Sequence, residues 1–272
     1  MFWLKEFEKQ LPMLPLQQLE DHFCLSQFSD WPNAKGLNSL NQNIRGVHST
    51  VPEFVCQSRL AQTDKYYEQI IYEQNIIPTR PNGWHDLFNG LVWIQFPKTK
   101  GLLNKQHIDD INGFGLSPRT QRRNKLTHFD ECGVIITYTN TAENSSLVDA
   151  LREHQWQQVF VENRHKWGKE LNSFMFGHAN LEMLLCPFIG LTGKWLAVEV
   201  DAQFEEASYT QQLALLDSKL ATMIESQDWF SKQKPLSPLP LLGIPNVWNA
   251  NNSPSFYQNK DYFRPKPLRK SD

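Results

Sequence analysis

The segment from Trp84 to Phe96, WHDLFNGLVWIQF, constrains the fold more than any other part of the 272-residue sequence. Its apolar side chains recur at the spacing of one face of an α-helix: Trp84, Leu87, Phe88 and Leu91. A second face carries three polar groups and an aromatic ring: His85, Asp86, Asn89 and Trp93. Burying three polar side chains costs a few kcal/mol unless each finds a partner. The segment therefore predicts a helix whose polar face belongs either to an internal hydrogen-bond network or to a cleft.

The composition excludes several classes of protein. With 40% hydrophobic and 21% charged residues and a net charge of -2, the chain is expected to be globular, and it lacks the cationic excess of a strongly basic polymer binder. The start, MFWLKEFEKQ, does not resemble a secretory signal, and no apolar run is long enough to cross a bilayer. The four cysteines form no CxxC pair and are expected to be reduced thiols. These features favour a cytoplasmic protein without a membrane partner.

Periodicity predicts a helix-rich α+β fold. Three short β-rich segments are expected to form a small, about three-stranded sheet: residues 133–139, 171–176 and 195–201. Helical spacing predicts the main helices: residues 66–75, 84–96, 98–111, 118–128, 145–167 and 211–229.

We expect one domain with three parts. Residues 1–62 would form an N-terminal helical layer and residues 63–230 the core. Residues 231–272 are rich in proline but also contain five large aromatic side chains, whose exposure would forfeit roughly 1.5 to 3 kcal/mol each. This last part is therefore expected to be an irregular strap that packs on the body.

Five motifs together resemble a known bacterial family, domain of unknown function 3025. They are TRPNGWHDLFNGLVWIQFPKTKGLLNKQH (Thr79 to His107), Arg119 and Arg123 followed by LTHFDECG, then FGHANLE, GLTGK, and the closing PLPLLGIPNVW with FYQNKDYFRP. The resemblance covers about Thr79 to Pro265 and implies no activity, since the family name records none. Three positions depart from the family's pattern: Asn124 replaces an Asp, His128 a Leu, and Asn246 a Gly.

The first functional hypothesis gathers histidines and carboxylates into one metal or acid/base site. A zinc or manganese ion would be held by His85, His107 and His178 with Asp130 or Glu182, because neutral imidazoles and carboxylates suit these ions. Asp86 or Glu182 would act as the catalytic base. His178 and Glu182 lie four positions apart and would reach the same side of a helix, although such a pair also stabilises a helix by about 0.2 to 0.5 kcal/mol without any ligand.

The second hypothesis rests on a local excess of positive charge. Between residues 98 and 125, seven cations stand against only Asp109 and Asp110. The cations are Lys98, Lys100, Lys105, Arg119, Arg122, Arg123 and Lys125. Arg119 and Arg123 are one helical turn apart, so their guanidiniums could grip one phosphate or carboxylate; the alternative is a solvated face with no ligand.

Two functions therefore remain open. One is a metal-assisted hydrolase whose small anionic substrate is held by Arg119, Arg123, Asn89 and Trp93. The other is a non-catalytic binding protein that recognises nucleic acid or an acidic partner through residues 98–125. The sequence has no GxSxG, GxxxxGK[ST] or GxGxxG motif, which disfavours serine-hydrolase, P-loop and dinucleotide chemistry.

Overall fold

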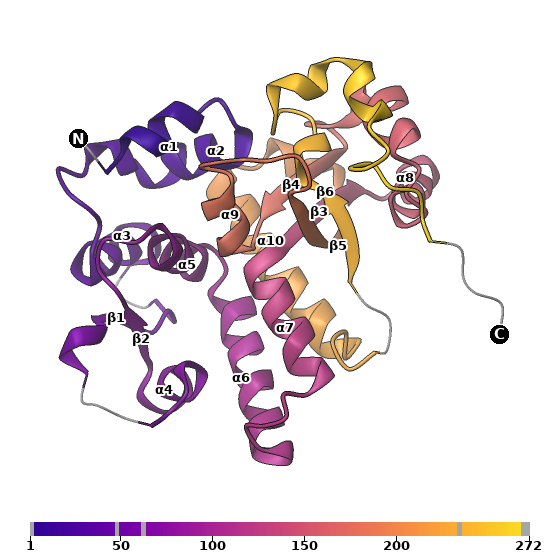
Figure 1. The fold of residues 1–272 in the computed structure, drawn as a ribbon. Helices are drawn as coiled ribbons and strands as arrows, with labels where there is room; N and C mark the ends of the chain where they lie inside the picture. Colours follow the sequence, from indigo (N-terminus) through magenta and orange to yellow (C-terminus); the bar gives the residue numbers. More distant parts are fainter. Residues whose placement is uncertain (1–2, 47–48, 61–63, 233–235, 268–272) are drawn as a thin grey trace.

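A computed structural model describes residues 3–46, 49–60, 64–232 and 236–267, and it confirms a helix-rich α+β fold (Figure 1). Within these residues no helix is both long and apolar enough to pass through a membrane. The helices are α1 (Lys5–Gln10), α2 (Leu14–Phe23), α3 (Ala34–Arg45), α4 (Tyr67–Gln74), α5 (Trp84–Gln95), α6 (Pro97–Phe114), α7 (Gln121–Cys132), α8 (Ala142–Arg152), α9 (His178–Met183) and α10 (Tyr209–Ser226).

The main sheet has four strands in the order β4-β3-β5-β6. The inner strands β3 (Gly133–Thr139) and β5 (Thr192–Val200) run parallel to each other. The outer strands β4 (Leu171–Met175) and β6 (Ser237–Pro240) are each antiparallel to their neighbours. The β-branched sequence GVIITYT of β3 suits its place, because all but one of its residues are buried.

The sheet is larger than the sequence predicts, since β6 comes from the proline-rich segment that was expected to be irregular. Its sequence SPLP contains two residues without a backbone N–H, which confines such a strand to the edge of a sheet, where β6 lies. A second, two-stranded parallel sheet joins β1 (Glu53–Cys56) and β2 (Ile76–Thr79). Both strands have four residues, too few for a clear periodic signal.

Two further expectations change in detail. The helix predicted for 145–167 ends as α8 at Arg152, and His154 has a left-handed backbone with φ of 57°. A short π-helical turn and a 3-10 turn follow it. The helix predicted for 118–128 is confirmed with a shift, because Thr120 caps α7 by accepting the backbone N–H of Arg123.

One hydrophobic cluster includes side chains from the first helices, the sheet and the proline-rich segment. Tyr257, Tyr262 and Phe263 are buried in it, so the described part of this segment packs on the body as expected. The predicted boundary at residues 62 and 63 lies outside the described residues. Helix α5 packs against α3 and α9, while α6 packs against α4, α7 and α10. These contacts bring α4, α5, α6, α7 and α9 together around one cavity.

Candidate functional site

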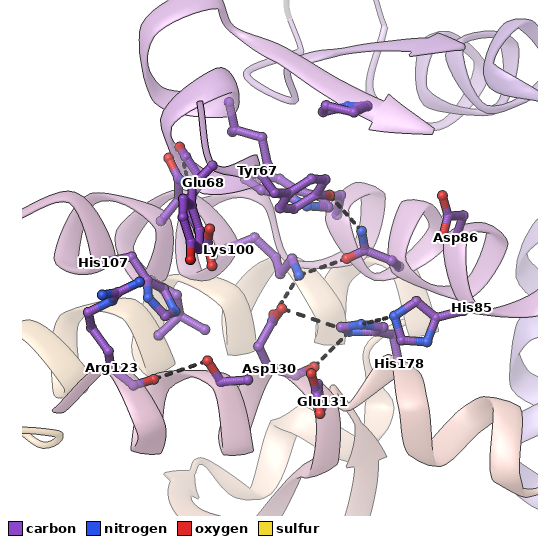
Figure 2. A pocket seen from close by; sticks show the side chains of 18 of the residues that line it. Tyr67, Glu68, His85, Asp86, Lys100, His107, Arg123, Asp130, Glu131 and His178 are labelled. Carbon is purple, nitrogen blue, oxygen red and sulfur yellow. Dashed lines mark hydrogen bonds and ion pairs between the residues drawn. The ribbon is translucent and has the colours of Figure 1, made fainter. Parts of the chain in front are cut away.

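A cavity of about 690 Å³ lies between α4, α5, α6, α7 and the start of α9 (Figure 2). Three of these helices each present side chains at a spacing of three or four residues, which places them on one face. The three stripes are His85, Asn89 and Trp93 on α5, Lys100, Asn104 and His107 on α6, and Arg123, Thr127 and Asp130 on α7. The polar face predicted for residues 84–96 thus lines a cleft.

Two imidazoles from distant parts of the chain meet at one end of this cavity. Nε2 of His85 lies 3.2 Å from Nε2 of His178. The opposite nitrogens are both held: Nδ1 of His85 is 3.0 Å from a carboxylate oxygen of Glu182, and Nδ1 of His178 is 2.8 Å from the carbonyl oxygen of Asp130. His178 is buried, whereas the His85 side chain is 38% exposed and therefore reachable from solvent.

The partners of the two rings determine where their hydrogens lie. A carbonyl oxygen only accepts, so Nδ1 of His178 must donate to Asp130. An ionised Glu182 likewise only accepts, so Nδ1 of His85 donates to it. In the neutral rings, both Nε2 atoms are then lone-pair acceptors that face each other. This arrangement is repulsive unless a positive centre, either a proton or a metal ion, lies between them.

Lys100, which is buried, forms an ion pair with the half-buried Asp130 beside His178. Nζ of Lys100 lies 2.5 Å from Oδ1 of Asp130 and 2.9 Å from the side-chain oxygen of Asn89. Asn89 in turn donates to the hydroxyl of Tyr67 at 2.8 Å. Burial acts to raise the pKa of Asp130, but Lys100 and His178 outweigh it, and the pKa lies below its usual value. The network thus keeps a negative charge within 3.8 Å of Nδ1 of His178.

The remaining predicted site residues have other surroundings. Both oxygens of Asp86 are held by Arg80, through its backbone N–H and its guanidinium. The ring of Trp93 lies under Lys100, with Nζ 5.3 Å from the ring centroid. His107 lies at the opposite end of the cavity from the His85 and His178 pair (Figure 2).

Two of the four expected metal ligands therefore meet, His85 and His178. Asp130 contacts His178 at Nδ1, the ring nitrogen that faces away from His85. His107 lies away from these three residues, at the other end of the cavity (Figure 2). Across the part of the chain that the structure describes, no group of three or more His, Cys, Asp and Glu side chains is arranged to hold a metal ion.

Burial and neighbouring cations set the charge of His107. Burial lowers the pKa of His107, and Arg119 and Arg123 lower it further, against the opposing effects of Glu68 and Asp130. His107 is consequently neutral near pH 7. It lies beside Arg123 at one end of the cavity, which Arg119 also lines (Figure 2).

The sequence did not predict three of the hydrogen-bond partners in the cavity. They are Lys100 as the partner of Asp130, Tyr67 as the partner of Asn89, and Arg80 as the partner of Asp86. A signal for Lys100 does exist, because Lys100, Asn104 and His107 follow the same helical spacing as the stripe on α5. Tyr67 and Arg80 have no such signal, since they reach the cavity from α4 and from the segment after β2.

Each of the seven cations between residues 98 and 125 donates to a group within the chain. Lys98 contacts Ser218, Lys105 pairs with Asp109, and Arg122 pairs with Asp110. Lys125 donates to carbonyl oxygens of the segment after α10, and Arg119 donates to Thr127. Lys100 and Arg123 are buried. Much of the local positive charge thus serves the fold and the cavity, while binding of nucleic acid to this stretch stays a prediction.

Comparison with known families agrees with the resemblance of the sequence motifs. The family model DUF3025, described as a protein of unknown function, matches residues 52–267. The chain belongs to this family. The match begins earlier than the sequence motifs suggested, so it includes β1, α4 and hence Tyr67 and Glu68 of the cavity. No curated protein and no solved structure matches the chain.

Burial of His178 predicts a pH dependence of stability. Burial, with Lys100 and His85, lowers the pKa of His178 from 6.5 to about 4, against the opposing effect of Asp130. Between these values the unfolded chain binds more protons than the folded one, so the free energy of unfolding falls as the pH falls from 6.5 towards 4. The loss reaches about 3 kcal/mol.

Urea unfolding with EDTA present, measured between pH 4 and 7, checks this expectation. The variant His178→Asn should show a shallower pH dependence than the unchanged chain, because the other buried histidines titrate in both. Equal slopes in the two proteins would contradict the assigned burial effect.

Proposed function

We propose that this protein is a metal-assisted hydrolase for a small anionic substrate, with the reaction centred on His85 and His178. One observation carries the proposal: the two Nε2 atoms face each other at 3.2 Å while both Nδ1 atoms are held by oxygen. Histidine ligands of metals usually donate their second ring nitrogen to a carboxylate or carbonyl oxygen, which fixes the tautomer. Both rings of this pair have that arrangement.

The separation of the two nitrogens suits a tetrahedral ion. With metal–nitrogen distances of about 2.0 to 2.1 Å, two nitrogens 3.2 Å apart subtend about 100 to 106° at the metal, close to the tetrahedral angle. Two histidines supply half of such a coordination sphere. The other positions would be filled by water and by oxygens of the substrate, and a bound divalent ion would lower the pKa of that water towards neutrality.

The surrounding residues support distinct roles in this proposal. Glu182 and the carbonyl oxygen of Asp130 orient the imidazoles, so both are positioning groups. Lys100 keeps Asp130 charged, which strengthens the ligand character of His178. Asp86 is held by Arg80 at the rim, which favours positioning over proton transfer for this carboxylate. Arg119 and Arg123 also line the cavity, where they would hold the anionic substrate.

Metal uptake tests the proposal directly. Calorimetric titration of EDTA-treated protein with Zn²⁺ or Mn²⁺ should show one site per chain, and either His85→Ala or His178→Ala should abolish it. His128→Ala is the matched control, because His128 is exposed on α7 and is not among the side chains that line the cavity. Hydrolysis of anionic chromogenic esters should then depend on the metal. Undiminished hydrolysis in EDTA would instead indicate that the pair shares a proton and acts as an acid–base couple.

A further inference from the structure

The side chain of Arg123 is buried without a carboxylate partner. Its residue is 1% exposed, yet it forms no ion pair with any acid of the described residues. Nη1 donates to the carbonyl oxygen of Leu116 at 2.9 Å, and Nε has no hydrogen-bond partner. A buried charge is costly unless it is paired and hydrogen-bonded. The neighbouring Arg122 shows the usual solution, since its guanidinium pairs with the buried Asp110 at 2.9 Å.

His107 is a second buried group without a full set of partners at the same end of the cavity. It is 5% exposed, and its Nδ1 has no hydrogen-bond partner. Arg119 and Arg123 both act on His107 electrostatically, and all three line the cavity. Figure 2 shows His107 and Arg123 side by side at one end of it. Arg119 is exposed and donates a guanidinium N–H to Thr127, which also lines the cavity. Glu68 is the carboxylate of the facing helix α4 that also acts on His107.

We propose that Arg119, Arg123 and His107 form a phosphate subsite, and that the substrate carries a phosphate monoester group in addition to the bond that is hydrolysed. Two guanidiniums with a neutral imidazole donor match a dianion with three terminal oxygens, whereas one bidentate arginine already satisfies a carboxylate. Asp130 and Lys100 lie between this subsite and the His85 and His178 pair (Figure 2). The phosphate is thus an anchor at one end of the cavity, and the bond to be hydrolysed lies towards the other.

This inference deepens the proposed function, and its test is kept separate from hydrolysis. Inorganic phosphate is titrated calorimetrically into the full chain with EDTA present, and thermal melting is recorded with and without phosphate. Phosphate should bind and raise the melting temperature, with acetate binding at least tenfold more weakly. Arg119→Gln should weaken phosphate binding roughly 10- to 100-fold without changing the melting temperature of the free protein. Lys105→Gln, an exposed cation paired with Asp109, should leave both properties unchanged.

Arg123→Met distinguishes a ligand group from a structural one. If the buried charge of Arg123 serves to bind an anion, this variant should melt at the same or a higher temperature than the phosphate-free parent protein. It should also lose the increase in melting temperature that phosphate causes. A variant that melts lower but keeps the shift would overturn the assignment of Arg123. Should Arg123→Met fail to fold, Arg119→Gln decides alone, and unchanged phosphate binding there would overturn the subsite.

The same titration on His178→Ala separates the two proposals. Phosphate binding that persists in this variant supports the subsite, whether or not the variant still binds a metal ion. Absence of phosphate binding in a parent protein that still takes up metal would overturn the subsite and leave the hydrolase proposal intact. Acetate binding as tight as phosphate binding would overturn the assignment of a phosphate monoester.

Discussion

Replacing His178 by Ala is expected to lower kcat/KM for a substrate that carries a phosphate monoester group by on the order of 10²- to 10⁴-fold. The ring is buried between the carbonyl oxygen of Asp130 and Nε2 of His85, and alanine supplies no nitrogen in its place. The loss should appear in kcat, because the phosphate anchor at Arg123 is untouched. Steady-state kinetics of the parent and the variant, both assayed at the same excess of metal ion, measure both constants.

Two comparison variants make the expected loss specific. Glu182→Gln keeps the shape of the side chain but removes the carboxylate charge beside Nδ1 of His85, so it should cost about 10- to 100-fold in activity or metal affinity. His128→Ala removes an exposed imidazole from α7 and should retain full activity. A His178→Ala enzyme that kept its kcat while its KM rose would contradict a role in the chemical step and favour a role in binding.

The helical core could be predicted from sequence because its signals are local. The stripe of Trp84, Phe88 and Leu91 required one buried face, and the structure buries Phe88 and Leu91 completely. The signal for the strand at 133–139 was also local, because its run of β-branched residues favours a strand over a helix. The edge strand β6 was not predictable in this way. Its two prolines are acceptable only because the neighbouring strand β5 lies on one side, which is a property of the assembled sheet.

The candidate site was predictable as a set of residues but not as an arrangement. Eight of the predicted polar or aromatic site residues line one cavity with His178, yet sequence distance contains no information about which nitrogen faces which. His107 shows the limit: its residue type suits a metal, but its position on α6 places it with Arg119 and Arg123. Asp86 shows a second limit of prediction from sequence. Its carboxylate is held by Arg80, which lies in the segment before α5 and not on the same helix.

Replacing Gly177 by Ala is expected to destabilise the protein by about 3 kcal/mol and to disturb the histidine pair. Gly177 lies where β4 turns into α9, and its backbone N–H donates to the carbonyl oxygen of Gly133 at 2.8 Å. A Cβ atom at this position would lie 2.5 Å from the carbonyl oxygen of Glu131 and 2.5 Å from the backbone nitrogen of Gly133. Backbone on both sides cannot move aside as a side chain can. The start of α9, and His178 with it, must therefore shift away from α7.

Gly101 provides the matched control for this substitution. It lies on an exposed face of α6, where a methyl group would meet no other part of the chain within 4 Å. Gly101→Ala should therefore stabilise the protein by about 0.5 to 1 kcal/mol through its effect on helix propensity. Urea unfolding measures both effects, and metal titration of Gly177→Ala measures the coupling of the turn to His178. A Gly177→Ala protein as stable as its parent would show that the close approach of α7 and α9 can relax. Metal affinity reduced in step with stability would show that this approach sets the 3.2 Å separation between His178 and His85.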